Sequence, residues 1–374
     1  MSSLKNILRK VDVSRCDIDV FPITNSGPNY EEVAKYAHVL GVNLEKTKEI
    51  SITNSVKASV FRAVKRIKKL LCYVGIDIST IVFKRVAQSL EKKNYDQVIA
   101  FQEGQATLLV SYIGHSSKVA WIRCDYSQLS LSKKKVNRDK KVYGSFDKIV
   151  CVSDFTKDRF LSIHQEMSSK TIAIHNIIAV ERIKDSAIIT PDGFELNSEG
   201  GFNLVSLGRL APVKRFTAIP KMAKEMLERG VEFKWYIIGA DDSDQINIER
   251  EISLNKVAES VILLGNRNNP YPYIAKADAL ICTSISEACP NVINEAKILG
   301  TPIVSSNFGS AREMLIDGEE GLISPIEEMS YAIIRLLTEK GLYASIKKNL
   351  SGFSYDNKEL LSQIANETSL KFFE

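Results

Sequence analysis

Two carboxylates, Glu287 and Glu295, lie eight positions apart in one short run, and two cations, Arg209 and Lys214, lie in a run further upstream. A carboxylate only accepts hydrogen bonds and can take two hydroxyl donors at once, which suits the hydroxyls of a ribose or a hexose. Arginine and lysine are the side chains that neutralise phosphate groups. Together the two runs predict a site for a sugar nucleotide.

Pro290 predicts that a helix begins between the two carboxylates. Its fixed φ is helical, and its missing N–H would be unpaired in a first turn anyway. The backbone amides of Asn291 and Val292 would then face outward at the positive end of the helix dipole, where an anion can bind. Gly208 would let the upstream loop approach a ligand closely.

Purely structural roles are open for the same residues. Arg209 and Lys214 could be solvated cations of a surface turn. Glu295 could be an exposed helical side chain, and Glu287 could cap a helix.

The acidic clusters predict no metal site. Asp17 and Asp19 match a D-x-D pattern, but they lie in an alternating strand, so we expect a solvated strand face. Asp241, Asp242 and Asp244 follow a strand, and we prefer a loop-to-helix cap to a divalent ion there. The four histidines do not cluster and predict no site, and no G-x-G-x-x-G follows the first strand, which disfavours a dinucleotide-dependent oxidoreductase.

Short apolar runs alternate with amphipathic stretches, which predicts parallel sheets covered by helices on both faces. The predicted strands are Cys16–Ile23, Val98–Phe101, Val119–Ile122, Ile149–Val152 and Thr171–Ile174, then Phe202–Leu207, Phe233–Ile238, Val261–Leu264, Ala279–Cys282 and Pro302–Val304. The fold class is therefore α/β, with two doubly wound, Rossmann-like domains facing a cleft, where ligands usually bind.

A polar, Gly-rich segment separates the two halves. We predict an N-terminal acceptor-side domain over 1–190, a linker over 191–201, a C-terminal nucleotide-sugar domain over 202–350 and a C-terminal helix over 351–374. Residues 3–11 have the pattern of a helix that leads straight to the first predicted strand.

Composition indicates a soluble globular protein: 374 residues, of which 44% are hydrophobic and 25% charged. No apolar run approaches the roughly 20 residues that span a bilayer, and the start has no signal-peptide core. Six scattered cysteines favour a reducing compartment over a disulfide framework or a structural zinc site. We expect a cytoplasmic protein.

The net charge of +5 contains two basic clusters, within 57–69 and 133–141. They would suit an anionic membrane surface, which implies peripheral attachment at its inner face, or a phosphorylated acceptor. Solvated helix faces explain them equally well. Nucleic acid is disfavoured as a partner because no nucleic-acid motif accompanies the charge.

Three runs of the second half, 207–216, 264–284 and 286–305, resemble the GT-B retaining glycosyltransferases of family 4. Their residues are LGRLAPVKRF, LGNRNNPYPYIAKADALICTS and SEACPNVINEAKILGTPIVS. They are most similar to bacterial enzymes of capsule, exopolysaccharide or lipopolysaccharide assembly. Residues 16–176 resemble the family more loosely. Family members open with a strand and a Gly-rich loop, so by this comparison the N-terminal domain lacks its first strand.

The resemblance implies a role for each matching residue. Arg209 and Lys214 would hold the diphosphate and stabilise its departure, and Glu287 would contact the donor sugar. The amides of Asn291 and Val292 would bind a phosphate.

The resemblance also implies how the nucleoside is held. Glu295 would accept the ribose hydroxyls, and Arg267 and Asn268 would flank the nucleobase. Glu313 would close a turn near the same pocket.

On the acceptor side, the resemblance points to Glu103, Arg123 and Asp125, which could equally be structural loop residues. Arg123 stands where the family has a histidine that faces the donor sugar.

The implied reaction is retaining transfer of a sugar from a UDP- or GDP-sugar to a saccharide or lipid-linked acceptor, with no metal and no cofactor. The alternative is a non-catalytic relative that binds sugar nucleotides as an assembly partner.

Overall fold

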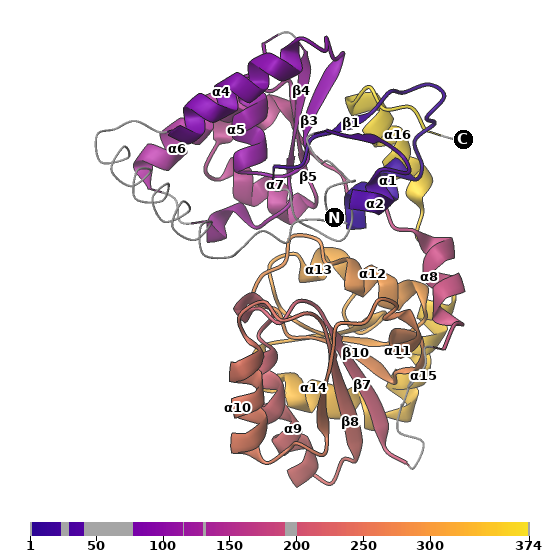
Figure 1. The fold of residues 1–374 in the computed structure, drawn as a ribbon. Helices are drawn as coiled ribbons and strands as arrows, with labels where there is room; N and C mark the ends of the chain where they lie inside the picture. The colour runs from indigo at the N-terminus through magenta and orange to yellow at the C-terminus, as the bar shows by residue number, and fades with distance from the viewer. Residues whose placement is uncertain are drawn as a thin grey trace, which may run out of the picture.

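The computed structural model describes residues 2–23, 30–40, 78–114, 116–129, 132–190 and 200–372. They form two lobes, one above the other in Figure 1. The basic cluster within 57–69 lies outside the described residues. Among the described residues, no helix has the length and apolarity needed to cross a membrane.

The second lobe is built on a six-stranded, fully parallel sheet in the order β12-β11-β10-β7-β8-β9. Its strands are β7 (Phe202–Leu207), β8 (Phe233–Ile238), β9 (Val261–Gly265), β10 (Ala279–Cys282), β11 (Ile303–Ser306) and β12 (Gly321–Ser324). Its helices are α9 (Ile219–Glu228), α10 (Gln245–Asn255), α11 (Tyr271–Lys276), α12 (Asn291–Ile298), α13 (Ala311–Met314), α14 (Met329–Thr338) and α15 (Lys340–Ser351).

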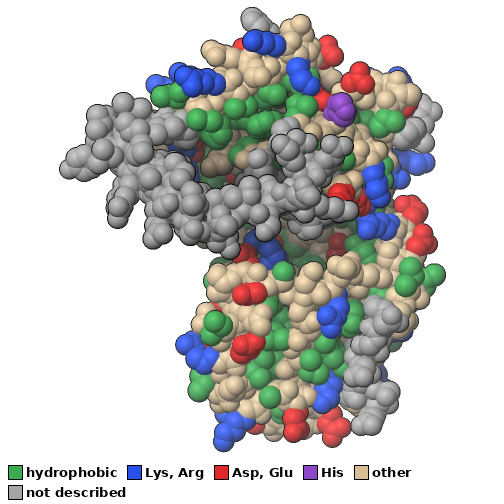
Figure 2. All heavy atoms as spheres, in the orientation of Figure 1, with side chains coloured by type: hydrophobic (Ala, Val, Ile, Leu, Met, Phe, Trp, Pro, Cys, Tyr) green, Lys and Arg blue, Asp and Glu red, His purple; other side chains and the backbone are tan. Residues whose placement is uncertain are grey.

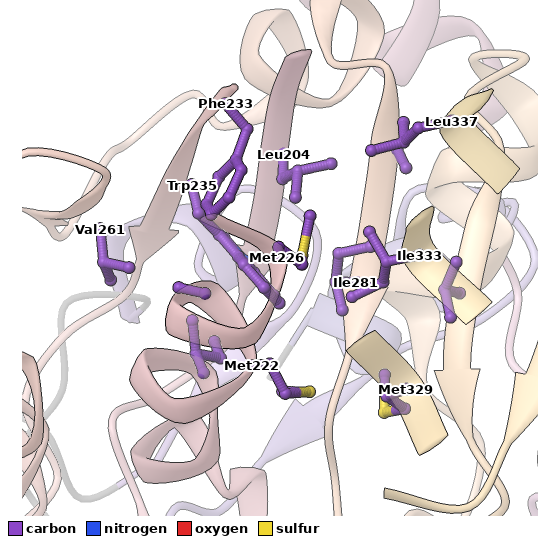
Figure 3. Packing of buried hydrophobic residues seen from close by; sticks show 14 of the residues in the cluster. Leu204, Met222, Met226, Phe233, Trp235, Val261, Ile281, Met329, Ile333 and Leu337 are labelled. Carbon is purple, nitrogen blue, oxygen red and sulfur yellow. The ribbon is translucent and has the colours of Figure 1, made fainter. Parts of the chain in front are cut away.

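Helices cover both faces of this sheet because successive strand side chains point to opposite sides. On one face, Leu204, Trp235 and Ile281 pack against α9 and α14, as Figure 3 shows. On the other face, Val205 and Leu280 belong to a second apolar cluster that includes residues of α11, α12 and α13. The strands are buried on both sides, which is why they appear in the sequence as short continuous apolar runs.

The first lobe has a four-stranded parallel sheet in the order β3-β4-β5-β6 and a separate pair, β1 and β2. The strands are β1 (Asp19–Val20), β2 (His38–Val39), β3 (Gln97–Ala100), β4 (Ser117–Ile122), β5 (Lys148–Cys151) and β6 (Thr171–Ala173). The helices are α1 (Ser2–Leu8), α2 (Tyr30–Val33), α4 (Ile78–Glu91), α5 (Gln105–Ser111), α6 (Lys133–Gly144) and α7 (Asp154–Leu161).

The last helix, α16 (Asn357–Glu367), returns to the first lobe (Figure 1). Lys148 of β5 forms an ion pair with Glu367, and the backbone N–H of Ser369 donates to Gln97 of β3. Ile364 of α16 joins the apolar cluster that contains Trp121 of β4. The chain therefore crosses between the lobes twice, first between β6 and α8 (Val180–Ala187), which packs against α11 and α12 of the second lobe, and again between α15 and α16.

The predicted fold class is confirmed: the chain is α/β with two Rossmann-like parallel sheets. All ten predicted strands are present, but Cys16–Ile23 is reduced to β1, because only Asp19 and Val20 find a ladder partner, in β2. The sequence did not predict β2 or β12. In the described residues the main sheet of the first lobe begins with β3.

Candidate functional site

The loop after β7 folds tightly enough to bring Lys214 back over Gly208. Gly208 has φ +154°, and a Cβ there would lie 3.1 Å from Cε of Lys214. Gly239, after β8, approaches so closely that its Cβ would lie 1.7 Å from the carbonyl oxygen of Gly208. Both positions therefore require glycine, and a 3₁₀ turn at Pro212–Lys214 completes the loop.

Lys214 and Glu287 meet because β7 and β10 are neighbours in the sheet. The Lys214 ammonium donates to Oε1 of Glu287, which also accepts from the Ser284 hydroxyl at 2.7 Å. The Thr283 hydroxyl donates to the Lys214 carbonyl at 2.7 Å. The side chains of Lys214 and Glu287 are only 19% and 15% exposed, so the pair is held in place from both loops.

Arg209 does not join this pair. Its side chain is 70% exposed and forms an ion pair with Asp242 in the loop after β8. The two cations predicted to act together therefore have different partners, Asp242 and Glu287.

Helix α12 begins at Asn291, with Pro290 at the cap position instead of in the first turn. The reason is that Pro290 has ψ 111°, which is extended and not helical. The amides of Asn291 and Val292 are the first of the helix, as expected. Glu295 lies one turn further on and is half-buried. Burial raises the pKa of its carboxyl to about 7.

Arg267 and Asn268 lie exposed in the loop between β9 and α11. The Nε of Arg267 donates to the Tyr273 hydroxyl at 3.4 Å. Both residues are at the carboxyl edge of the same sheet as Gly208 and the start of α12.

The acidic clusters have structural partners. Asp241 accepts from the backbone N–H groups of Asp244 and Gln245 at 3.2 and 3.1 Å, so the predicted cap is present. The expectation of a solvated strand face is wrong for Asp19, because the Lys93 ammonium and the Tyr95 hydroxyl donate to it. Within the described residues, no group of three or more His, Cys, Asp or Glu side chains is arranged to hold a metal ion.

The acceptor-side candidates lie where the first lobe meets the second. Asp125 is buried and accepts from the Ser286 hydroxyl of the second lobe at 3.1 Å. Glu103 accepts from the backbone N–H of Arg123 at 2.9 Å. The guanidinium of Arg123 lies over the Phe101 ring, 4.9 Å from its centroid. Figure 2 shows the surfaces of the two lobes from the side seen in Figure 1.

The backbone N–H of Glu313 donates to the Ser310 carbonyl at 3.1 Å and closes the expected turn, and the Glu313 side chain also joins the two lobes. Its carboxylate accepts from the backbone N–H groups of Asp154 and Phe155 and lies 2.5 Å from Nε2 of His175. Burial alone would raise the pKa of Glu313, but the hydrogen bonds from His175 and from the two amides outweigh it and lower the pKa. His175 was missed because an isolated histidine gives no sequence signal for a partner 138 positions away. The neighbouring Asn176 was also missed.

On the outer surface of the first lobe, α6 carries the second basic cluster. The exposed members of the cluster are Lys133, Lys134, Arg138, Lys140 and Lys141. Asp139 of the same helix is buried and accepts from the Tyr126 hydroxyl at 2.7 Å. The exposed face of α6 is therefore strongly cationic.

Residues 201–339, most of the second lobe, match the family described as Glycosyl transferases group 1. The chain is 26% identical over 266 residues to the N-acetylgalactosamine-N,N'-diacetylbacillosaminyl-diphospho-undecaprenol 4-alpha-N-acetylgalactosaminyltransferase of Campylobacter jejuni, covering 70% of this chain and 66% of that protein. It is 29% identical over 146 residues to the poly(glycerol-phosphate) alpha-glucosyltransferase of Bacillus subtilis, covering 38% of this chain and 22% of that protein. The chain spans about half to two thirds of the length of the first curated relatives, at 55%, 66% and 54%.

Two solved structures share the fold over nearly the whole chain. HepE of Anabaena, in complex with UDP and glucose, superposes with a TM-score of 0.74 at 17% identity, covering 98% of this chain and 94% of that one. A glycosyltransferase of Rickettsia africae superposes with a TM-score of 0.68 at 14% identity, covering 97% and 93%.

Proposed function

We propose that this chain, a glycosyltransferase of the GT-B fold, transfers a sugar from a nucleotide-sugar donor to a saccharide or lipid-linked acceptor with retention of configuration. The observation that carries the proposal is the Lys214–Glu287 pair. It lies over Gly208 in neighbouring loops at the carboxyl edge of the β7–β10 sheet. A cation and a hydroxyl-accepting carboxylate in contact are what a sugar diphosphate requires.

In the proposed reaction the leaving diphosphate is stabilised electrostatically. Lys214 and the first amides of α12 receive its charge, and Arg209 exchanges Asp242 for a phosphate oxygen. Glu287 orients the donor sugar. The acceptor oxygen then bonds to the sugar carbon from the face that the diphosphate leaves, and the proton of the acceptor hydroxyl passes to the departing phosphate oxygen, so the chain supplies no nucleophile of its own.

We assign the nucleoside of the donor to α12 and the loop after β9, at the carboxyl edge of the same sheet. Glu295 accepts the ribose hydroxyls, while Arg267 and Asn268 flank the base. Among UDP and GDP, UDP is favoured, because the superposable HepE structure holds UDP. Metal ions and cofactors have no role in this proposal.

We assign the acceptor to the first lobe, near Asp125 and Glu103, and the process to surface-polysaccharide assembly. The relatives named above include an enzyme acting on a diphospho-undecaprenol and one acting on poly(glycerol-phosphate). A lipid-linked acceptor fits a cytoplasmic protein bound peripherally at the inner membrane face through the cationic surface of α6. Nucleic acid is not a partner in this proposal.

One observation favours the alternative, a binder without turnover. Arg123 replaces the histidine expected to face the donor sugar, and its guanidinium instead donates to Asn176 and Ser3. The first lobe then offers no imidazole at that position.

A panel of UDP- and GDP-sugars, incubated with the purified chain with and without membrane extract, tests the two alternatives. Nucleotide release above background, lost in Lys214→Met and kept in the matched control Lys221→Met, supports catalysis. Lys221 is a suitable control because it is 78% exposed on α9. Saturable binding without release supports the binder. Neither binding nor release would refute both.

Sedimentation with vesicles tests the membrane contact separately. Neutralising Lys133, Lys134 and Lys141 should reduce binding to anionic vesicles and leave binding to neutral vesicles unchanged. Equal binding of wild type and variant would remove α6 from the proposal.

A further inference from the structure

Asn176, in the first lobe, contacts the turn that begins α12 in the second lobe. Its Nδ2 donates to the carbonyl of Cys289 at 3.2 Å and to Oδ1 of Asn291 at 2.9 Å. These two residues flank Pro290, where the chain turns from extended to helical. One amide group of the first lobe therefore holds both sides of that turn.

The orientation of the Asn176 amide is fixed by its neighbours. Its Oδ1 accepts from Nη1 of Arg123 at 3.3 Å, and a guanidinium can only donate. The Cys289 carbonyl can only accept, so exchanging the amide oxygen and nitrogen would break the contacts with both. Asn176 is only 6% exposed, so this exchange would leave unpaired polar atoms in a buried site, which is costly.

Arg123 is in turn held within the first lobe. Its Nη2 donates to the Ser3 hydroxyl at 2.8 Å, its backbone N–H donates to Glu103, and its guanidinium lies over Phe101. Burial lowers the pKa of this guanidinium. A partly buried cation needs its donors paired, so Arg123 is anchored and gives Asn176 a fixed support.

We propose that Asn176 is a positioning residue through which the first lobe orients the phosphate-binding turn of the second. This inference rests on the proposed function, because it takes the first amides of α12 as the diphosphate site. The turn keeps its geometry only while the lobes are in contact, so the nucleoside diphosphate binds fully only to the closed arrangement. By thermodynamic reciprocity, the bound diphosphate holds the lobes together.

The test compares a nucleoside diphosphate with its nucleoside, measured by calorimetry on the full chain. UDP and uridine are used, or GDP and guanosine if the wild type binds those. Asn176→Ala should lower UDP affinity about tenfold, because a buried acceptor loses its donor and the turn loosens. Uridine affinity should stay within about twofold, since the nucleoside does not reach that turn.

Tyr355→Phe is the matched control. The Tyr355 hydroxyl donates to the backbone carbonyl of Asn176 at 2.6 Å, so this variant removes a contact of the same residue but leaves its amide in place. UDP affinity should change less than about twofold. The double variant Asn176→Ala with Asn291→Ala should lose less UDP affinity than the sum of the two single losses, because the two changes share the Asn176–Asn291 contact.

Three results would overturn the inference: equal losses for UDP and uridine, no loss for UDP in a folded Asn176→Ala, or an equal loss in Tyr355→Phe. If Asn176→Ala does not fold, Asn291→Ala gives the readout instead, because it removes one of the two acceptors of Asn176 and keeps the backbone amide. Its UDP loss should be smaller but still selective over uridine, since the contact with Cys289 remains. A wild type that binds no nucleoside diphosphate would refute the proposed function itself, so the two failures are distinguishable.

Discussion

Ionisation of Glu295 at high pH should make the protein less stable in the absence of ligand. The same ionised carboxylate should bind the ligand more tightly. Its pKa is raised from 4.5 to about 7 by burial. A carboxyl whose folded pKa lies above its unfolded pKa contributes stability that is present below pH 4.5 and lost as pH rises through about 7. Glu295→Gln removes the titration but keeps the shape, so it should stabilise the protein at pH 8 and not at pH 4.

The size of the effect follows from the pKa shift. Each pKa unit corresponds to about 1.4 kcal/mol, so the shift sets an upper limit of about 3 kcal/mol for the stability lost. The Glu295 side chain keeps part of its surface exposed, and solvent reduces this figure. For a lobe of this size, 1–2 kcal/mol raises the melting temperature by roughly 5 °C.

Calorimetric unfolding of wild type and Glu295→Gln at pH 4 and pH 8 measures the difference. Glu228→Gln is the control, because Glu228 is 64% exposed on α9. A gap in melting temperature that is the same at both pH values would refute the reasoning.

Nucleoside affinity should show the opposite pH dependence to stability. Only the ionised carboxylate accepts hydrogen bonds from both ribose hydroxyls, so wild-type affinity should rise as pH passes about 7. The nucleoside is used because phosphate titrates in the same range. Glu295→Gln should bind more weakly at pH 8 and show no such rise.

Three further predictions concern the lobes. Glu313→Gln should destabilise the protein more at pH 7 than at pH 4, measured by thermal unfolding. The pKa of Glu313 is lowered, so its stabilisation is present above pH 4.5 and is lost as pH falls. His164 is fully buried, neither ring nitrogen has a hydrogen-bond partner, and burial lowers its pKa. Its contribution is therefore lost as pH falls below 6.5, and His164→Leu should make urea unfolding less sensitive to acid between pH 7 and pH 5. Gly309→Ala would place a Cβ 2.0 Å from Cζ of Phe155 in the other lobe. This variant should fold but show reduced nucleotide release, and full activity would contradict the packing.

The second lobe could be predicted closely because its signals are local. Its central strands are buried on both faces, so β7, β8 and β10 have the bounds that their apolar runs predict. Lys214 and Glu287 lie in loops after neighbouring strands, and a parallel sheet brings such loops together. The meeting of the two side chains therefore followed from the order of elements.

Contacts between the lobes could not be predicted in the same way. Asn176 and Asn291 are 115 positions apart, and neither lies in a periodic pattern that would point to the other. Arg209 shows a related limit. Its position after a strand correctly predicted that it lies at the carboxyl edge of the sheet. Its ion pair with Asp242 could not be predicted, because it depends on which loop lies nearest.

The return of α16 to the first lobe means that the first lobe is not one continuous stretch of polypeptide. A fragment ending at residue 190 would leave Trp121 and its apolar neighbours without the helix that shields them, and such a surface invites aggregation. Dissection of this protein should therefore retain residues 352–372 in tandem with the amino-terminal portion, through a short spacer in place of the whole second lobe. Fluorophores or affinity handles attached at the carboxyl terminus will likewise report on the amino-terminal half, because Phe372 pairs with Val11.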